Sequence, residues 1–154
     1  MAYPEPGVYR MWYSSRVRRM PGRSERGGAR PGALEDGGKR VPAIFYRTEA
    51  GGEPVRGWLK EMPAEDRKRI GEDVKTVEFG WPIGMPVCRP LGGGLFEVRT
   101  SLARNRIARV LFYIDARGRM VLLHGFIKKD RRTPQYDLDL AKSNRAKHQG
   151  EFDD

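Results

Sequence analysis

Two stripes of apolar residues, spaced three and four positions apart, predict a pair of amphipathic helices between residues 53 and 80. The first stripe contains Val55, Trp58, Leu59 and Met62, and the second contains Ile70, Val74 and Val77. Pro63 would end the first helix and can begin the second, while Gly80 is a plausible end of the second. We therefore expect two antiparallel helices joined by a tight turn.

Short apolar runs rich in β-branched and aromatic residues predict four strands. They cover residues 43–46, 95–100, 106–115 and 120–128. Asp115 to Gly118 supply hairpin turn chemistry between the last two strands, and the Pro- and Gly-rich residues 81–94 are interpreted as a loop. After the last strand, Thr133 is suited to cap a C-terminal helix that has Pro134 at its first position. Because the strands cluster after a helical pair, the sequence indicates an α+β fold and not an alternating α/β fold.

Alternation along the strands assigns side chains to the two faces of the sheet. In residues 106–115, the apolar positions suited to pack on helices are Ala108, Val110, Phe112 and Ile114. Arg109 and Tyr113 then project together from the opposite face. In the preceding strand Arg99 shares a face with Glu97, so Arg99 and Arg109 would flank a common surface. The alternative for either arginine is a solvated residue or an ion-pair partner, such as Arg99 with Glu97.

The net charge of +10 is concentrated in part of the chain. Residues 99–132 contain 10 basic and 2 acidic residues, whereas residues 41–98 contain 8 and 9. A solvated surface usually mixes its signs, so the basic stretch is a candidate phosphate-binding face. It ends in four basic residues within five positions, Lys128, Lys129, Arg131 and Arg132. Such a run also occurs on surfaces that bind nothing.

Residues 1–40 contain seven Gly, four Pro and many Arg. A segment of this composition cannot bury enough apolar surface to offset the entropy of ordering it, so we expect a disordered tail. The alternatives for its role are an auxiliary nucleic-acid-binding arm, a passive tail, or upstream sequence joined by a misassigned start codon. The folded domain would span residues 41–150, and residues 151–154 would form a short acidic tail.

The single cysteine, Cys88, excludes an intrachain disulfide and a cysteine-cluster metal site. No apolar run approaches the roughly 20 residues needed to cross a bilayer, and the N-terminus lacks the apolar stretch of a secretory signal. We therefore expect a cytoplasmic protein that needs no membrane, metal or cofactor.

Four segments in the second half of the chain share an order and spacing that is more specific than any one of them. They are residues 94–99 (GLFEVR), 109–113 (RVLFY), 122–129 (LLHGFIKK) and 133–134 (TP), with Ala141 in the following helix. Over roughly residues 41 to 148, the chain resembles the phage-derived HigB-like branch of the RelE/ParE toxin superfamily. The resemblance implies a RelE-like antiparallel sheet with helices on one face and a concave basic groove on the other.

The resemblance also implies metal-independent, ribosome-dependent cleavage of mRNA by attack of a ribose 2′-OH on the adjacent phosphate. That reaction needs a base for the hydroxyl, cations for the phosphorane charge and an acid for the leaving oxygen. Carried onto this sequence, Arg99 and Arg109 would orient and neutralise the phosphate. Lys128 and Lys129 would bind it or transfer a proton, and Tyr113 would stack on a base or bond to the phosphate.

His124 is the best acid–base candidate by its ordinary pKa, with a satisfied structural histidine as the alternative. The residues expected to contact the RNA around the site are Arg106, Lys129, Arg131 and Arg132. In or near the last helix, Tyr136 is expected to pack in the core and His148 to lie in an exposed tail.

Two other functions remain open. The ParE branch of the same superfamily poisons DNA gyrase, and a basic sheet with an Arg/Gly tail also suits a non-catalytic nucleic-acid-binding protein. If the chain is a toxin, the resemblance implies a cognate antitoxin, a small acidic or helix-turn-helix protein encoded next to it.

Overall fold

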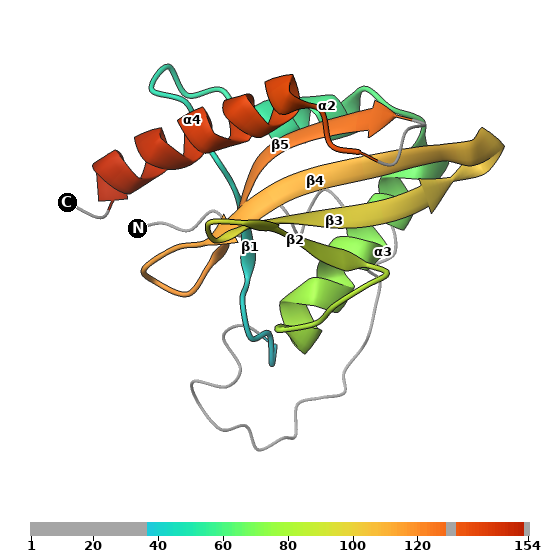
Figure 1. Ribbon diagram of the computed structural model, residues 1–154, viewed down its shortest axis with the longest axis horizontal. Coiled ribbons are helices and arrows are strands. Elements are labelled where there is room, and N and C mark those ends of the chain that lie inside the picture. The colour runs from blue at the N-terminus through green and yellow to red at the C-terminus, as the bar shows by residue number, and fades with distance from the viewer. Residues whose placement is uncertain (1–36, 129–131, 153–154) are drawn as a thin grey trace.

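The computed structural model describes residues 37–128 and 132–152 (Figure 1). Its elements are, in order, β1 (Ala43–Phe45), α2 (Pro54–Lys60), α3 (Ala64–Gly80), β2 (Cys88–Gly92), β3 (Leu95–Leu102), the 3-10 turn η2 (Ala103–Asn105), β4 (Arg106–Ile114), β5 (Met120–Lys128) and α4 (Gln135–Phe152). The α+β class and the predicted helical pair are confirmed. The predicted disordered tail falls mostly on residues 1–36, which lie outside the described residues.

The strands of the described residues form one five-stranded sheet in the order β1-β5-β4-β3-β2. β1 runs parallel to β5, whereas the other neighbouring strands are antiparallel. The expectation of a wholly antiparallel sheet is therefore corrected at one edge. No hairpin joins β1 to β5, since both helices and three strands separate them in the chain, so connectivity does not impose an antiparallel pairing.

β2 lies in the segment that the sequence pattern assigned to a loop. It is an edge strand, which tolerates Pro90 because an edge leaves one side of the backbone without ladder partners. The turn into β3 is made by Gly92, Gly93 and Gly94, whose φ angles are 98°, 65° and 83°. Glycine adopts these angles without a steric penalty, so the triple glycine is a tight hairpin turn.

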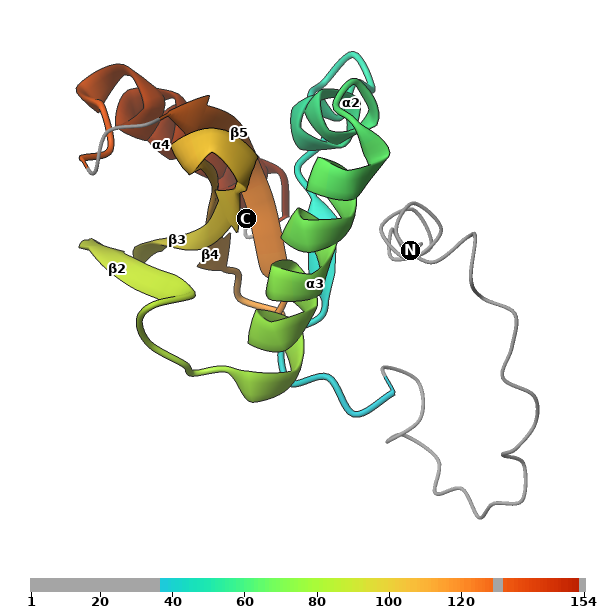
Figure 2. The same ribbon diagram turned by 90° about the vertical axis from the view of Figure 1, so that its right-hand side faces the viewer.

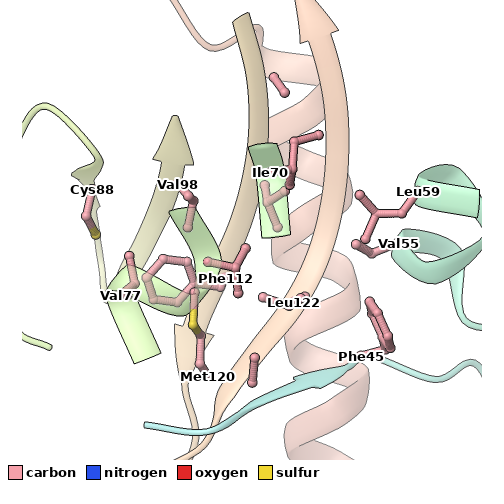
Figure 3. Packing of buried hydrophobic residues seen from close by; sticks show 14 of the residues in the cluster. Phe45, Val55, Leu59, Ile70, Val77, Cys88, Val98, Phe112, Met120 and Leu122 are labelled. Carbon is pink, nitrogen blue, oxygen red and sulfur yellow. The ribbon is translucent and has the colours of Figure 1, made fainter. Parts of the chain in front are cut away.

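The helical pair α2 and α3 covers one face of the sheet (Figure 2). Side chains from both helices and from all five strands meet there in the main core (Figure 3). Fully buried members include Leu59 from α2, Val74 from α3 and Phe112 from β4. Val110 and Phe112 point into this core, as the alternation of β4 predicts.

α4 covers the opposite face of the sheet. A second buried cluster lies beneath it, formed by Ile44, Tyr46, Leu95, Leu111, Tyr113, Val121, Leu123 and Ala141. This face was expected to be an open basic groove, and the expectation is wrong for the part under α4. The cause is a layer of α4 side chains, including Leu138 and Ala141, that packs on the sheet.

A bulge in β5 decides which way its last residues point. Leu111 pairs with His124, but the next residue, Phe112, pairs with Leu122, so Leu123 is an extra residue in β5. Leu123 and His124 consequently both face α4, because the extra residue shifts the alternation. Gly125 then faces the helical pair, where the Trp58 ring packs directly against its Cα.

The residues that enter the fold before β1 are tied to the end of α3. Lys39 Nζ lies 3.0 Å from Glu78 Oε2, and both side chains are almost fully buried. The same carboxylate accepts a 2.7 Å hydrogen bond from the backbone of Ala43. Burial raises the pKa of Glu78, and the charge of Lys39 opposes that rise. Glu78 thus joins the chain on both sides of Val41 to the C-terminal end of α3.

We expect Gly125→Ala to lower the free energy of unfolding by about 1–3 kcal/mol, because the added methyl group would overlap the Trp58 ring. Chemical denaturation followed by circular dichroism measures the change. Gly57→Ala is the matched control, since Gly57 lies in α2 with open space around it and alanine favours helices. Equal stability of the two variants would contradict the packing of Trp58 on Gly125.

Candidate functional site

The sheet register brings the predicted site residues onto one face, the face that α4 partly covers. Arg99 pairs with Arg109, and Arg109 pairs in turn with Phe126. Two residues further along the same pair of strands, Ile107 pairs with Lys128. Directly opposite residues project from the same face, so these side chains form rows across β3, β4 and β5. The register therefore places Arg99 and Arg109 side by side on one face of the sheet, as the alternation predicts.

Glu97 lies at the centre of this face with no exposed surface. Its Oε1 accepts a 2.7 Å hydrogen bond from the Thr133 hydroxyl. Its Oε2 lies 3.5 Å from Arg89 Nη1 and 3.7 Å from Arg99 Nε. A carboxylate removed from water needs such compensation, because an uncompensated buried charge costs several kcal/mol. The ion pair between Arg99 and Glu97, one of the two alternatives for Arg99, is therefore present.

Arg109 is fully buried, although it was expected on an open surface. Its Nη1 is 3.4 Å from the Thr133 hydroxyl, and its guanidinium carbon lies 6.0 Å from the centre of the Phe126 ring. The segment before α4 and the Phe126 ring thus stand between Arg109 and solvent. Arg99, whose side chain is 18% exposed, and the half-buried Lys128 are the more accessible cations of the rows.

His124 has a carboxylate partner that the sequence analysis missed. Its Nε2 lies 2.6 Å from Oδ1 of Asp137, in the first turn of α4. Because an ionised carboxylate only accepts hydrogen bonds, Nε2 is the donor in this contact, and Nδ1 is the ring nitrogen left for another partner. The ring also stacks on Phe126 with centroids 5.6 Å apart. A histidine oriented in this way suits proton transfer.

Tyr113 of β4 packs against His148, which lies in the C-terminal half of α4. Tyr113 is 4% exposed, its ring meets His148 edge to face, and Arg145 lies over it. The predicted contact of Tyr113 with RNA is therefore wrong for this conformation. His148 was expected in an exposed tail, but it is buried with Nε2 3.2 Å from Asp115 Oδ2. Conversely, Tyr136 was expected in the core and is 71% exposed.

The other predicted RNA contacts have separate locations. Arg106, at the start of β4, forms a salt bridge of 3.1 Å with Asp66 of α3, so it also ties the sheet to the helical pair. Arg132 is exposed just before α4. Lys129 and Arg131 lie outside the described residues.

The residues described offer little else for catalysis. Cys88 is buried, and burial, together with the negative charge of Glu97, raises its pKa to about 11, so the thiol stays protonated at neutral pH. Across residues 37–128 and 132–152, no three His, Cys, Asp or Glu side chains gather as a metal site would need. In the same part of the chain, no helix has the length and apolar character to span a bilayer.

Residues 57–146 match the family model described as phage-derived protein Gp49-like (DUF891). The chain belongs to this Gp49-like family. The Gp49-like family is associated with RelE-like toxins of toxin–antitoxin systems. The matched region of this Gp49-like chain includes Arg99, Arg109, His124, Lys128 and Asp137. No individual curated protein matches the chain.

In this Gp49-like protein, we expect Glu97→Gln to lower the free energy of unfolding by about 3 kcal/mol, because it removes the buried counter-charge of the partly exposed Arg89 and Arg99. Denaturant titration measures the loss. Glu53→Gln is the matched control, since Glu53 also lies near two arginines, Arg47 and Arg56, but at the surface. The free energy of unfolding of that control should fall by less than about 1 kcal/mol. Similar losses in both variants would show that Glu97 is not an electrostatic centre.

A second prediction concerns Asp115, which anchors α4 through His148. Burial alone would raise the pKa of Asp115, but hydrogen bonds from His148 and Arg119 hold it well below its usual range. A carboxylate whose pKa is lowered by folding stabilises the protein at pH values above its ordinary pKa near 4. This stabilisation is lost as the pH falls below that value. Asp115→Asn should therefore be less stable than wild type by roughly 2 kcal/mol at pH 7, with a gap that narrows below pH 4.

Thermal unfolding at pH 7, 5 and 3 measures that gap. Asp139→Asn is the control, because Asp139 is an exposed carboxylate on α4 whose bond to Gln135 lies at the surface. A gap that stays constant over this range would rule out the charged anchor.

Proposed function

We propose that this protein is the toxin of a type II toxin–antitoxin pair and cleaves mRNA on the ribosome without a metal. The observation that carries the proposal is the set of rows across β3, β4 and β5. There, Arg99 pairs with Arg109, Lys128 lies on the same face, and His124 is held by Asp137. Family membership supports the toxin part, and the rows support phosphate chemistry.

The chemistry suits RNA because RNA carries its own nucleophile. The ribose 2′-oxygen attacks the adjacent phosphorus, so the O2′–P bond forms and the P–O5′ bond breaks, which leaves a 2′,3′-cyclic phosphate and a 5′-hydroxyl. His124 Nδ1 would take the 2′ proton, and the Lys128 ammonium would supply a proton to the leaving oxygen. Arg99 and Lys128 would offset the negative charge that grows on the phosphate oxygens.

Arg109 has a different part in this proposal from the one its sequence position implied. Because it is buried beneath Phe126 and Thr133, it is a positioning residue in this conformation. It donates to the Thr133 hydroxyl, which in turn bonds Glu97, and it is the cross-strand neighbour of the more accessible Arg99. The RNA would approach from the open side of the rows, where Lys128 and the exposed Arg132 lie.

One observation favours a second candidate, a nucleic-acid-binding protein without catalysis. Arg99 and Arg109 both have internal partners, as purely structural arginines do. Such a protein would bind RNA through its surface cations, and single substitutions would weaken binding in small, additive steps. Catalysis instead requires that loss of His124 stops the reaction while binding persists.

The proposal includes an antitoxin that neutralises the toxin. With a net charge of +10, the chain is complementary to an acidic partner. Masking of the rows by such a partner would account for neutralisation without further chemistry.

The test is cell-free translation with added protein and mapping of mRNA ends. We expect ribosome-dependent cuts with wild type, and a loss of at least about 100-fold with His124→Ala or Arg99→Ala, the scale of general acid–base and electrostatic catalysis. Lys142→Ala, which removes an exposed charge from α4, should cut like wild type.

Sedimentation with ribosomes then separates catalysis from binding. His124→Ala should still bind ribosomes, because the substitution leaves the cations in place. Undisturbed translation at ample wild-type protein would overturn the nuclease proposal, and a gyrase supercoiling assay would then test the ParE-like alternative.

A further inference from the structure

A groove of about 590 Å³ adjoins the rows at the edge of the sheet. β2 pairs with β3 as far as Val98, and the Arg99 N–H donates one further bond of 2.9 Å to the Val87 oxygen, so the last residues of β3 continue beyond β2 toward the hairpin tip (Figure 1). The groove lies between this edge, α3 and the loop before β2. Arg99 lines it and also belongs to the rows. A molecule bound to Arg99 therefore has direct access to the groove.

Two polar side chains in the groove lack a full set of partners. Thr100 is 2% exposed, and its hydroxyl makes no hydrogen bond of good geometry with any described residue. Beside it is the half-buried carboxylate of Asp73, whose pKa is raised by burial against the opposing effect of the Thr100 hydroxyl. The Thr100 hydroxyl favours the charged form of Asp73, so the two groups lie together, and a ligand in the groove would meet both of them.

The cations that line the groove already have protein partners. Arg69 is held by Glu65 at 3.4 Å and by the backbone oxygen of Ser101 at 3.3 Å, and Arg99 lies near Glu97. The acceptors are less occupied, since the residues described provide no ion pair for Asp73. The groove therefore favours a ligand rich in hydrogen-bond donors and disfavours a bare anion.

Its other wall is apolar. Met85 is 56% exposed there, next to Pro86 and Val87, with Ile107 on the sheet side. An apolar wall facing a few polar groups is typical of a site for a flat, heteroaromatic ligand, and a volume of several hundred Å³ accommodates one. Unstacked RNA bases are recognised in this way, by stacking and by hydrogen bonds to their edges.

We propose that the groove binds a guanine base next to the scissile phosphate. Guanine presents two adjacent donors, N1–H and the N2 amine, which match the two oxygens of the Asp73 carboxylate. Its O6 and N7 are acceptors, which suit the Thr100 hydroxyl or a guanidinium. Adenine, cytosine and uracil each place an acceptor beside their donor on that edge, which would repel the carboxylate. The inference rests on the proposed function only for RNA as the source of the guanine.

Titration of the full-length protein with GMP, AMP, CMP and UMP, followed by backbone amide NMR, tests the binding. We expect GMP to shift the amides of Ser101 and Ile107 and to bind at least tenfold more tightly than the other three, the discrimination typical of a two-bond base contact. Equal shifts with all four nucleotides, or with inorganic phosphate, would show an anion at Arg99 and overturn the proposal. Absence of shifts would also overturn it.

Two variants locate the site. Asp73→Asn should abolish the tenfold preference, because the amide brings a donor against the donors of guanine. Thr100→Val should weaken GMP binding, because it removes the buried hydroxyl beside Asp73 while a methyl group keeps its volume. Glu61→Gln is the matched control, an exposed carboxylate at the end of α2 outside the groove. GMP affinity that is unchanged in Asp73→Asn would place the base elsewhere.

End mapping in the translation assay separates this inference from the proposed function. If both hold, Asp73→Asn shifts the distribution of cuts away from guanine-flanked sites. If wild type binds GMP at Ser101 and Ile107 but cuts no RNA, the groove stands and the nuclease proposal falls. Cuts whose sequence preference is the same in wild type and Asp73→Asn would contradict guanine binding in the groove and leave the nuclease proposal intact.

Discussion

The buried carboxylate of Glu97 organises the face on which the candidate site is built. Three arginines, Arg89 of β2, Arg99 of β3 and Arg109 of β4, gather there, and their like charges repel one another. Glu97 lies at ion-pair distance from Arg89 and Arg99, and through Thr133 it is linked to Arg109. The same hydroxyl fixes the chain just before α4. A concentration of positive charge at this face thus depends on one acid in its middle.

This arrangement joins stability to function through α4. The helix closes the second cluster, supplies Asp137 to His124 near one end and places His148 on Asp115 near the other. Arg145 adds a 2.8 Å bond to the backbone of Gly93 in the β2–β3 turn. The proposed general base is therefore oriented by the same element that completes the fold, so movement of α4 would change both.

The local sequence pattern predicts much of the fold and part of the candidate site. The two helical stripes predict the helical pair. The alternation of side chains along β3 and β4 places Arg99 and Arg109 on one face, and the structure pairs them directly. These features depend on neighbours within a few residues. The burial of Arg109 and Tyr113 depends on α4, whose inward face mixes Leu138 and Ala141 with polar residues such as His148 and so carries no clear apolar stripe. Likewise, β2 is a strand because it lies beside β3, against the preference of its Pro and Gly.

The extra residue in β5 has a consequence for how this strand tolerates change over evolution. Upstream of Leu123 the side chains keep one alternation, and downstream His124, Phe126 and Lys128 follow the other. Because Leu123 is the extra residue, its loss would give an unbroken alternation that keeps His124 facing α4 and Gly125 facing Trp58, and would remove only the Leu123 side chain from the second cluster. The bulge is therefore the one place in β5 where the strand can lose a residue and keep both faces, whereas an insertion or deletion elsewhere in the strand would exchange core and site for the residues that follow it.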